Sequence, residues 1–278
     1  MKKIPFLAFF ALASAGMILV FSCNKAKVDT NTTTASDYSM CQNEFIHLLP
    51  MFNSIACKKS MVRGIEYRVS SGGAPHWPQV TYDTTHGWPR TITVNYGGGV
   101  TDSIDGQTRA GIVKGAFADY WDNLSTTSLT ITFVGYSVNN NSYGGTVTVY
   151  RNHQSLTQFS ANISGICNVT GYPPLLFNAN GLSYNWVNGV YPPDTIPWQG
   201  QYAINGSGTG QDRNQVKYNF VISGTLIKNN NCANVSQGIV TITPAGLANR
   251  IVTYTGGNNC NTSATVTIDG QNYTITSN

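Results

Sequence analysis

The sequence predicts a mostly β protein, in which antiparallel strands form one or two sandwich-like modules after a short N-terminal helix. Thr, Val, Ile and Tyr are abundant and 28 residues are Gly, a composition that favours short strands joined by tight turns. Residues 91–96 alternate apolar and polar side chains, as a strand with one buried face requires. Residues 45–56 instead carry apolar side chains at steps of three and four, which is the spacing of one helical face.

Residues 1–22 predict a secretory signal peptide that ends at a lipidation site. Lys2 and Lys3 supply the positive start, residues 4–21 the apolar core, and Ser22 the small residue before Cys23. The pattern Val20-Phe21-Ser22-Cys23 resembles the bacterial lipobox, with Phe21 bulkier than that pattern usually has. The resemblance implies that Cys23 carries the lipid and is the new N-terminus. It also implies the outer membrane, since Asn24 stands where an Asp favours inner-membrane retention. The alternative is that residues 4–21 stay uncut as a membrane helix.

The next two segments differ in pattern. Residues 23–36 are polar and Thr-rich, and we expect them to form a lipidated tether. Residues 37–58 predict a helix that kinks or splits near Pro50, because proline removes a backbone donor and clashes with the preceding turn. The apolar face of this helix is expected to pack on the β region, with binding of a partner protein as the alternative.

Strand signals dominate the rest of the chain. We expect a first β module over residues 59–170 and a second over 171–278, because the paired prolines in Gly171-Tyr172-Pro173-Pro174 cannot continue a sheet. A strand led by Arg and closed by Gly-Gly occurs twice, and each copy is followed by Ile-Asp-Gly-Gln, at 104–107 and 268–271. Behind a lipobox, these modules resemble the uncharacterised β-rich lipoproteins of Bacteroidetes-type bacteria. That resemblance implies a compartment and a lineage, and no mechanism.

The cysteines predict one disulfide. Cys41, Cys57, Cys167, Cys232 and Cys260 follow Cys23, and an exported protein meets an oxidising compartment. Cys232 and Cys260 lie in matching Asn-flanked turns, so we expect these two to pair. The alternative is that they are buried free thiols.

The composition argues against several classes of function. The net charge is +4 and only 10% of residues are charged, whereas nucleic-acid binding needs a clustered basic face. Two Glu and ten Asp offer few carboxylate pairs, and Asp119 and Asp122 are three apart beside strand-like sequence. Neither a Gly-x-Ser-x-Gly elbow nor a CxxC motif occurs. We therefore expect no catalytic residue and no cofactor.

A metal site is not expected either. The local cluster of metal-ligand types is His76, Asp83 and His86, and imidazole with carboxylate suits a divalent transition ion. The spacing of these residues matches no familiar metal site.

Loop aromatics give the main functional hint. Trp88 lies between Gly87 and Pro89, ahead of a strand, so we expect its indole in a turn, where sugar rings stack. Trp77, Tyr82 and His86 are expected to complete a shallow glycan-binding platform. The alternative is that these aromatics plug the ends of a β sandwich.

Three segments resemble the Asp-Ser/Thr-apolar sequon for O-glycosylation in the same bacteria. The resemblance implies modification at Thr84, Ser103 and Thr195. Taken together, the sequence indicates a non-enzymatic, lipid-anchored envelope protein whose partners are membrane lipid through Cys23 and glycans or envelope proteins. The alternatives are a surface-fibre subunit resembling fimbrillin-type lipoproteins, and a hydrolase of unrecognised type.

Overall fold

The structure is a computed structural model. It describes residues 29–56, 78–83, 85, 87–102, 105–121, 127–152, 154–188, 200–257, 260 and 263–276. The chain divides into two units at Thr30, and the second, Asn31–Asn278, holds all the helices and strands described below. Among the described residues, no helix is long and apolar enough to cross a lipid bilayer.

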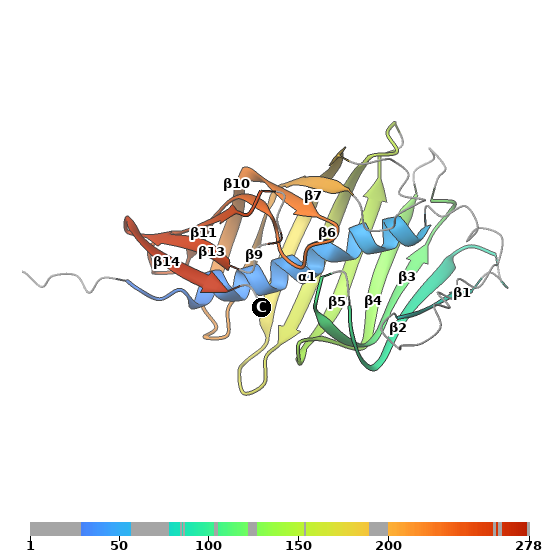
Figure 1. Ribbon diagram of the computed structural model, residues 1–278, viewed down its shortest axis with the longest axis horizontal. Coiled ribbons are helices and arrows are strands. Elements are labelled where there is room, and N and C mark those ends of the chain that lie inside the picture. Colours follow the sequence, from blue (N-terminus) through green and yellow to red (C-terminus); the bar gives the residue numbers. More distant parts are fainter. Residues whose placement is uncertain are drawn as a thin grey trace, which may run out of the picture. The chain divides into compact units, whose positions relative to one another are not determined.

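The predicted fold class is confirmed, since one helix precedes one long antiparallel sheet (Figure 1). The elements are α1 (Thr33–Ala56), β1 (Gln79–Asp83), β2 (Arg90–Thr101), β3 (Thr108–Phe117), β4 (Ser128–Val138), β5 (Asn141–Arg151), β6 (Gln158–Asn168), β7 (Leu175–Asn188), β8 (Gln201–Asn205), β9 (Ser207–Gln211), β10 (Lys217–Asn229), β11 (Gln237–Pro244), β12 (Arg250–Thr255), β13 (Ser263–Ile268) and β14 (Gln271–Thr276).

Nearly every strand pairs with its neighbours in sequence. The exception is the pair β8 and β9, which both lie between β7 and β10 and are separated only by Gly206. The expected module boundary at Gly171–Pro174 lies in the turn between β6 and β7, which pair with each other over most of their length. The sheet therefore runs through this boundary, because the prolines lie in a turn and leave the ladder intact.

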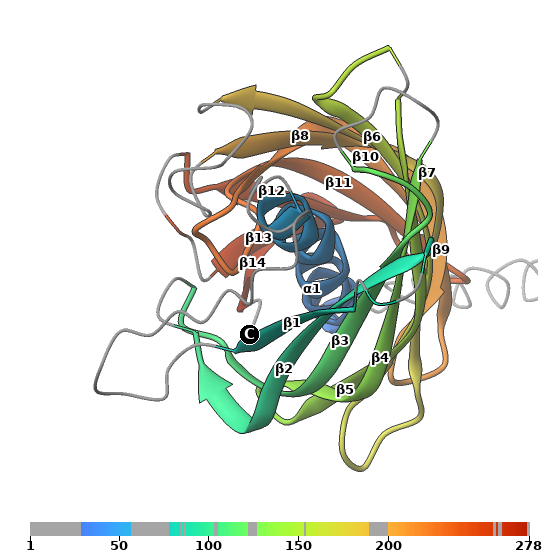
Figure 2. The same cartoon turned by 90° about the vertical axis from the view of Figure 1, so that its right-hand side faces the viewer.

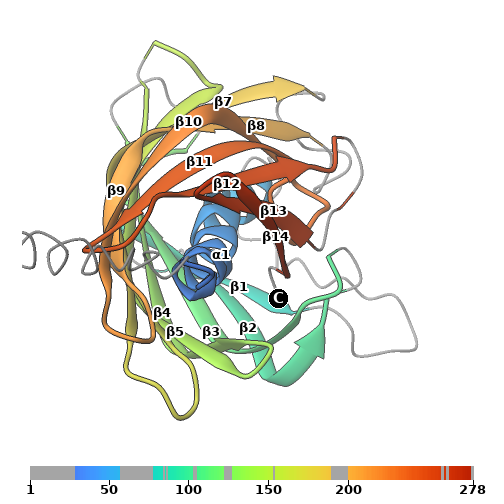
Figure 3. The ribbon, with the colours of Figure 1, turned by 90° about the vertical axis from the view of Figure 1, so that its left-hand side faces the viewer.

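The sheet curls around α1, so that the helix lies along its concave face (Figure 2, Figure 3). Side chains along each strand point alternately towards the helix and away from it, which gives the sheet an inner and an outer face. In β2, Ile92, Val94 and Tyr96 are buried towards the helix, while the residues between them point outward. This is the face that the sequence predicts for these three residues.

The helix differs from its prediction in where it begins. It starts at Thr33, within the expected tether, because the Asn31 side chain accepts a hydrogen bond from the Thr33 amide (2.8 Å) and caps the first turn. At the other end it runs through Pro50 without a break to Ala56, and residues 57 and 58 lie outside the described part of the chain.

The helix also differs in how it is buried. A single apolar face against the sheet was expected, but almost every residue of α1 is buried, including polar ones. Hydrogen bonds to the surrounding strands and loops satisfy five of these polar side chains. The pairs are Thr34 with Asp212 (2.6 Å), Ser39 with Tyr254 (2.8 Å), Asn43 with Asn234 (2.9 Å), Glu44 with Tyr136 (2.6 Å) and Asn53 with Tyr202 (2.7 Å).

Two glycines of the sheet let the helix approach closely. A Cβ on Gly165 in β6 would lie 2.4 Å from Cζ of Phe45, and one on Gly115 in β3 would lie 2.5 Å from Cε1 of Phe52. Because the two phenylalanines are seven residues apart, about two helical turns, they lie on one side of α1. The glycines therefore fix the depth at which α1 sits in the sheet.

Candidate functional site

The expected glycan platform is only partly within the described residues. Trp77 and His86 lie outside them. Tyr82 is on β1, half-buried and packed against the core. Trp88 is 36% exposed in the segment just before β2. An exposed position in a turn is what the flanking Gly87 and Pro89 predict for Trp88.

A second exposed aromatic residue lies beside Trp88. Tyr120, which follows β3 and is 40% exposed, has its ring centroid 4.8 Å from that of Trp88, with the planes at 69°. The Arg90 guanidinium lies 4.5 Å from the Trp88 ring centroid and 5.5 Å from that of Tyr120. We call Trp88, Arg90 and Tyr120 the aromatic rim surface.

The fold positions this surface at the end of the sheet near the C-terminus of α1. Arg90 begins β2 and its ladder partner Phe117 ends β3. Shortly after β3 ends, the chain turns Trp121 inward, where its indole N–H donates to Asn53 Oδ1 (2.8 Å) in the last turns of α1. Burial of Trp121 thus directs the adjacent Tyr120 outward.

Tyr120 is a residue that the sequence reasoning missed. The pair Tyr120-Trp121 follows a strand without a Gly or Pro between them, so alternation alone does not tell which ring is exposed. Trp88 was identified because glycine and proline flank it.

A hollow on the outer face of the sheet is a second candidate. It has a volume of about 560 Å³ and lies over β7, β9, β10 and the end of β11. Amide, hydroxyl and ammonium groups form part of its lining, beside apolar groups that include Leu176 and Pro244; the polar side chains are Asn178, Thr209, Gln211, Lys217, Asn219 and Thr243. Four of these form one cross-strand row, from Asn178 through Thr209 and Asn219 to Thr243. Such a lining suits a polar, uncharged ligand.

A third cluster is ionic and lies inside the sheet. Arg109 on β3 is 1% exposed, and its guanidinium nitrogens lie 2.7 Å from Asp105, 3.3 Å from Glu44 and 3.7 Å from Asp102. Tyr136 donates to Glu44 (2.6 Å). Although burial alone would raise it, the pKa of Asp105 is lowered to about 2 by the hydrogen bond and charge of Arg109.

The ionic cluster is not placed for catalysis. The cavity beside it, lined by Asn43, Glu44, Arg109 and Asn234 among others, measures about 20 Å³, which holds about one water molecule. A substrate would have no room there. The cluster instead ties α1, through Glu44, to β3 and β4.

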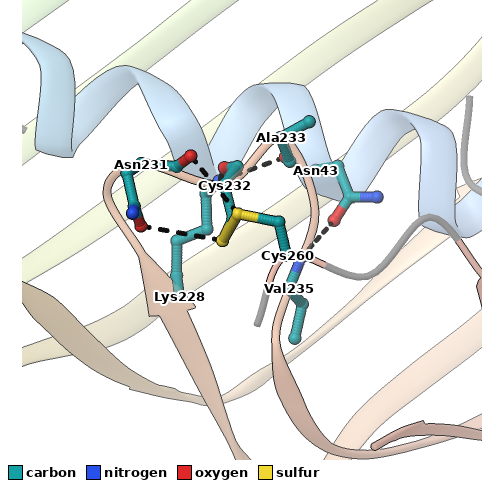
Figure 4. Close-up of a disulfide and its surroundings, with 7 residues drawn as sticks. All are labelled: Asn43, Lys228, Asn231, Cys232, Ala233, Val235 and Cys260. Atoms are coloured by element: carbon teal, nitrogen blue, oxygen red, sulfur yellow. Dashed lines mark hydrogen bonds between the residues drawn. A yellow bond between two sulfur atoms is a disulfide. The ribbon is translucent and has the colours of Figure 1, made fainter. Parts of the chain in front are cut away.

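The two cysteines predicted to pair are joined by a disulfide, Cys232–Cys260, with Cα atoms 5.0 Å apart (Figure 4). It fastens the segment after β10 to the segment before β13. The same segment contacts α1, since the Val235 amide donates to Asn43 Oδ1 (3.0 Å). Beside it, the Lys228 ammonium donates to the carbonyls of Cys232 and Ala233, and burial lowers the pKa of Lys228 to about 8.

The modification sites fall outside the described residues. This holds for Cys23, Thr84, Ser103 and Thr195. Asp102, the acidic residue of the second sequon, is buried, with its carboxylate 3.7 Å from Arg109. The O-glycosylation sites and the lipidation of Cys23 stay predictions.

Neither the metal-ligand residues of the described chain nor the comparisons with known proteins point to a function. In the described part of the chain, no group of three His, Cys, Asp or Glu side chains is arranged to hold a metal ion. Comparisons with family models, with curated proteins and with solved structures found no match to this chain. The function must therefore be argued from the surfaces above.

Proposed function

We propose that this protein is a non-enzymatic, lipid-anchored component of the bacterial envelope that binds a glycan at the aromatic rim surface. One observation carries the proposal: two aromatic rings from different loops, Trp88 and Tyr120, are exposed together and braced by Arg90. Sugar rings stack on such faces through their C–H groups, while amides and guanidinium groups bind the hydroxyls. The anchor at Cys23 and the outer-membrane location belong to the same proposal.

The test is a glycan array probed with the full-length mature protein in detergent, followed by affinity measurements on the best ligand. Trp88→Ala and Tyr120→Ala should each weaken binding about 5- to 30-fold, the loss of one stacking contact. Because both rings are exposed, the thermal midpoint should stay nearly unchanged.

Tyr172→Ala is the matched control. Tyr172 is 50% exposed and also has an arginine over its ring, with the Arg213 guanidinium 4.9 Å from the centroid. It lies in the turn between β6 and β7, away from the rim surface, so its removal should leave glycan binding intact. Equal losses in all three variants, or no glycan bound by the unmutated protein, would contradict the proposal.

A second candidate function, a surface-fibre subunit, is favoured by the ends of the sheet. Among the described strands, β1 and β14 each pair on one side only. Charged side chains and prolines usually keep an edge strand from pairing with another chain. The sequence of β14, Gln-Asn-Tyr-Thr-Ile-Thr, contains neither. Regular filaments of the purified protein in electron micrographs would support this function over the first.

The third candidate function, which the sequence analysis left open, is a hydrolase of unrecognised type. Its test is activity screening of the mature protein on glycans and peptides. Turnover that survives Trp88→Ala would place the chemistry away from the rim surface.

A further inference from the structure

Two buried thiols face each other between the helix and the sheet. Cys41 on α1 and Cys167 on β6 are free cysteines with no exposed surface. Cys167 is close enough to the Cys41 thiol to raise its pKa through a side-chain hydrogen bond. This pair is separate from the Cys232–Cys260 disulfide and from the rim surface.

The packing around the thiols explains why they meet. Phe45 lies one turn after Cys41 on the same side of α1, and its ring sits directly over Gly165 on the inner face of β6. Cys167 is two residues from Gly165 and therefore on the same face. One helical turn and two strand residues both span about 6 Å. The helix and strand spacings thus match, and Cys41 is placed over Cys167.

Tyr143 gives an independent check on this register. Its ring centroid lies 5.8 Å from that of Phe45, and it is the direct ladder partner of Cys167 on β5. Phe45 therefore contacts Gly165, two residues before Cys167 on β6, and also Tyr143, the residue opposite Cys167 on β5.

We infer that Cys41 and Cys167 form a second disulfide in the exported protein, which cross-links α1 to β6. Two S–H bonds break and one S–S bond forms, and the two electrons and two protons pass to the disulfide of a thiol-oxidising protein or of a small-molecule disulfide, which is reduced to two thiols. The Cys232–Cys260 disulfide needs an oxidant of the same class.

The reaction must occur before α1 is fully enclosed. The hydrogen bond with Cys167 and burial both raise the pKa of the Cys41 thiol, and only the thiolate attacks a disulfide. In the folded protein the thiolate is therefore scarce and sealed from any oxidant. The cross-link forms while the sheet closes around the helix and is protected from reduction afterwards.

Peptide mapping is the direct test. Full-length protein isolated from its host envelope is denatured with iodoacetamide and without reductant, then digested and analysed by mass spectrometry. We expect one linked species that joins the Cys41 and Cys167 peptides and disappears on reduction. Alkylation of both cysteines, or a link from either one to Cys57, overturns the inference.

A thermal double-mutant cycle supplies the second readout. Closing a loop on the order of 100 residues should raise the thermal midpoint by about 10 °C for a protein of this size. Cys41→Ala, Cys167→Ala and the double variant should then all lose about the same amount, because each removes the same bond. Cys57→Ser is the control and should leave the Cys41–Cys167 link in place. Losses that add in the double variant mean separate packing contributions and overturn the cross-link.

Discussion

The two faces of the sheet differ in where they place charge. The face around α1 holds buried ionic groups, which include Glu44, Arg109, Asp212, Lys228 and Arg250. The outer face carries mostly neutral hydrogen-bonding groups along a row that crosses ten strands. Its members are Thr81, Thr93, Lys114, Thr132, Thr146, Ser164, Asn178, Thr209, Asn219 and Thr243.

This is the reverse of the usual distribution, in which charged side chains cover the surface and are rarely buried. Inside, Arg109 pairs with Glu44 and Asp212 accepts from Thr34, so these charges hold the helix in position. Outside, one Lys stands in a row of hydroxyls and amides, which leaves the surface able to bind neutral polar ligands. Charge in this protein therefore helps to specify the interior, and substitutions on the two faces should differ in their effect on stability.

The largest effect is expected at Arg109. Arg109→Met keeps the length of the side chain but removes the cation that Glu44 and Asp105 contact, so urea denaturation should show that the free energy of unfolding falls by about 3–5 kcal/mol. Lys114→Met is the control, because Lys114 lies on the same strand and points outward. It should change the free energy of unfolding by about 0.5 kcal/mol or less. A loss at Arg109 no larger than at Lys114 would remove the contrast between the faces.

Glycine gives the next contrast. In Gly165→Ala the new Cβ meets the Phe45 ring at 2.4 Å, and overpacking of this kind costs about 1–3 kcal/mol. Gly144 lies one strand away on β5 and points outward, and a Cβ added there would meet no atom within 4 Å. Gly144→Ala should therefore be neutral or slightly stabilising by about 0.5 kcal/mol. Thermal midpoints of the two variants measured together decide the point.

Lowering the pH should also destabilise the inner face of the sheet. The pKa of Asp105 is about 2 in the folded protein, against an ordinary value of 3.8, so between these values the unfolded state binds more protons. Stability from this group is full above pH 4 and falls as the pH drops towards 2, by about 2 kcal/mol in all. Asp105→Asn should flatten the stability curve between pH 4 and 2. An unchanged slope would mean that other carboxylates control the acid response.

Parts of this contrast could be predicted from sequence and parts could not. Alternation in Ile92, Val94 and Tyr96 predicts their burial, and matched Asn-rich turns predict Cys232 with Cys260, because both signals are local. The burial of the polar residues of α1 could not be predicted in this way, since Ser39 and Asn43 have the side chains of solvent-facing positions. Their partners Tyr254 and Asn234 lie 215 and 191 residues further along the chain, and no local pattern links them.

The way the strands assemble could not be derived from the sequence either, where Pro173 and Pro174 favoured a boundary between two modules. Short alternating strands fit two modules as well as one curled sheet, because both bury one face of each strand. At the rim surface, Trp88 was identified from its flanking residues, whereas Tyr120 depends on which of two adjacent rings packs against Asn53. Such a choice is made by the tertiary fold.

The smallest effect is expected on the outer row, where two adjacent residues of β5 separate the faces. Thr146 is exposed between Thr132 and Ser164, while Val147 is buried towards α1. Thr146→Val keeps a β-branched side chain and removes only a solvated hydroxyl, so the free energy of unfolding should change by about 0.5 kcal/mol or less. Val147→Thr places a hydroxyl of the same size in the core and should cost about 1–3 kcal/mol. Equal stability of the two variants would mean that the outer hydroxyls are packed or hydrogen-bonded as tightly as the interior side chains. The outer row would then stabilise the fold and would not be a surface available to ligands.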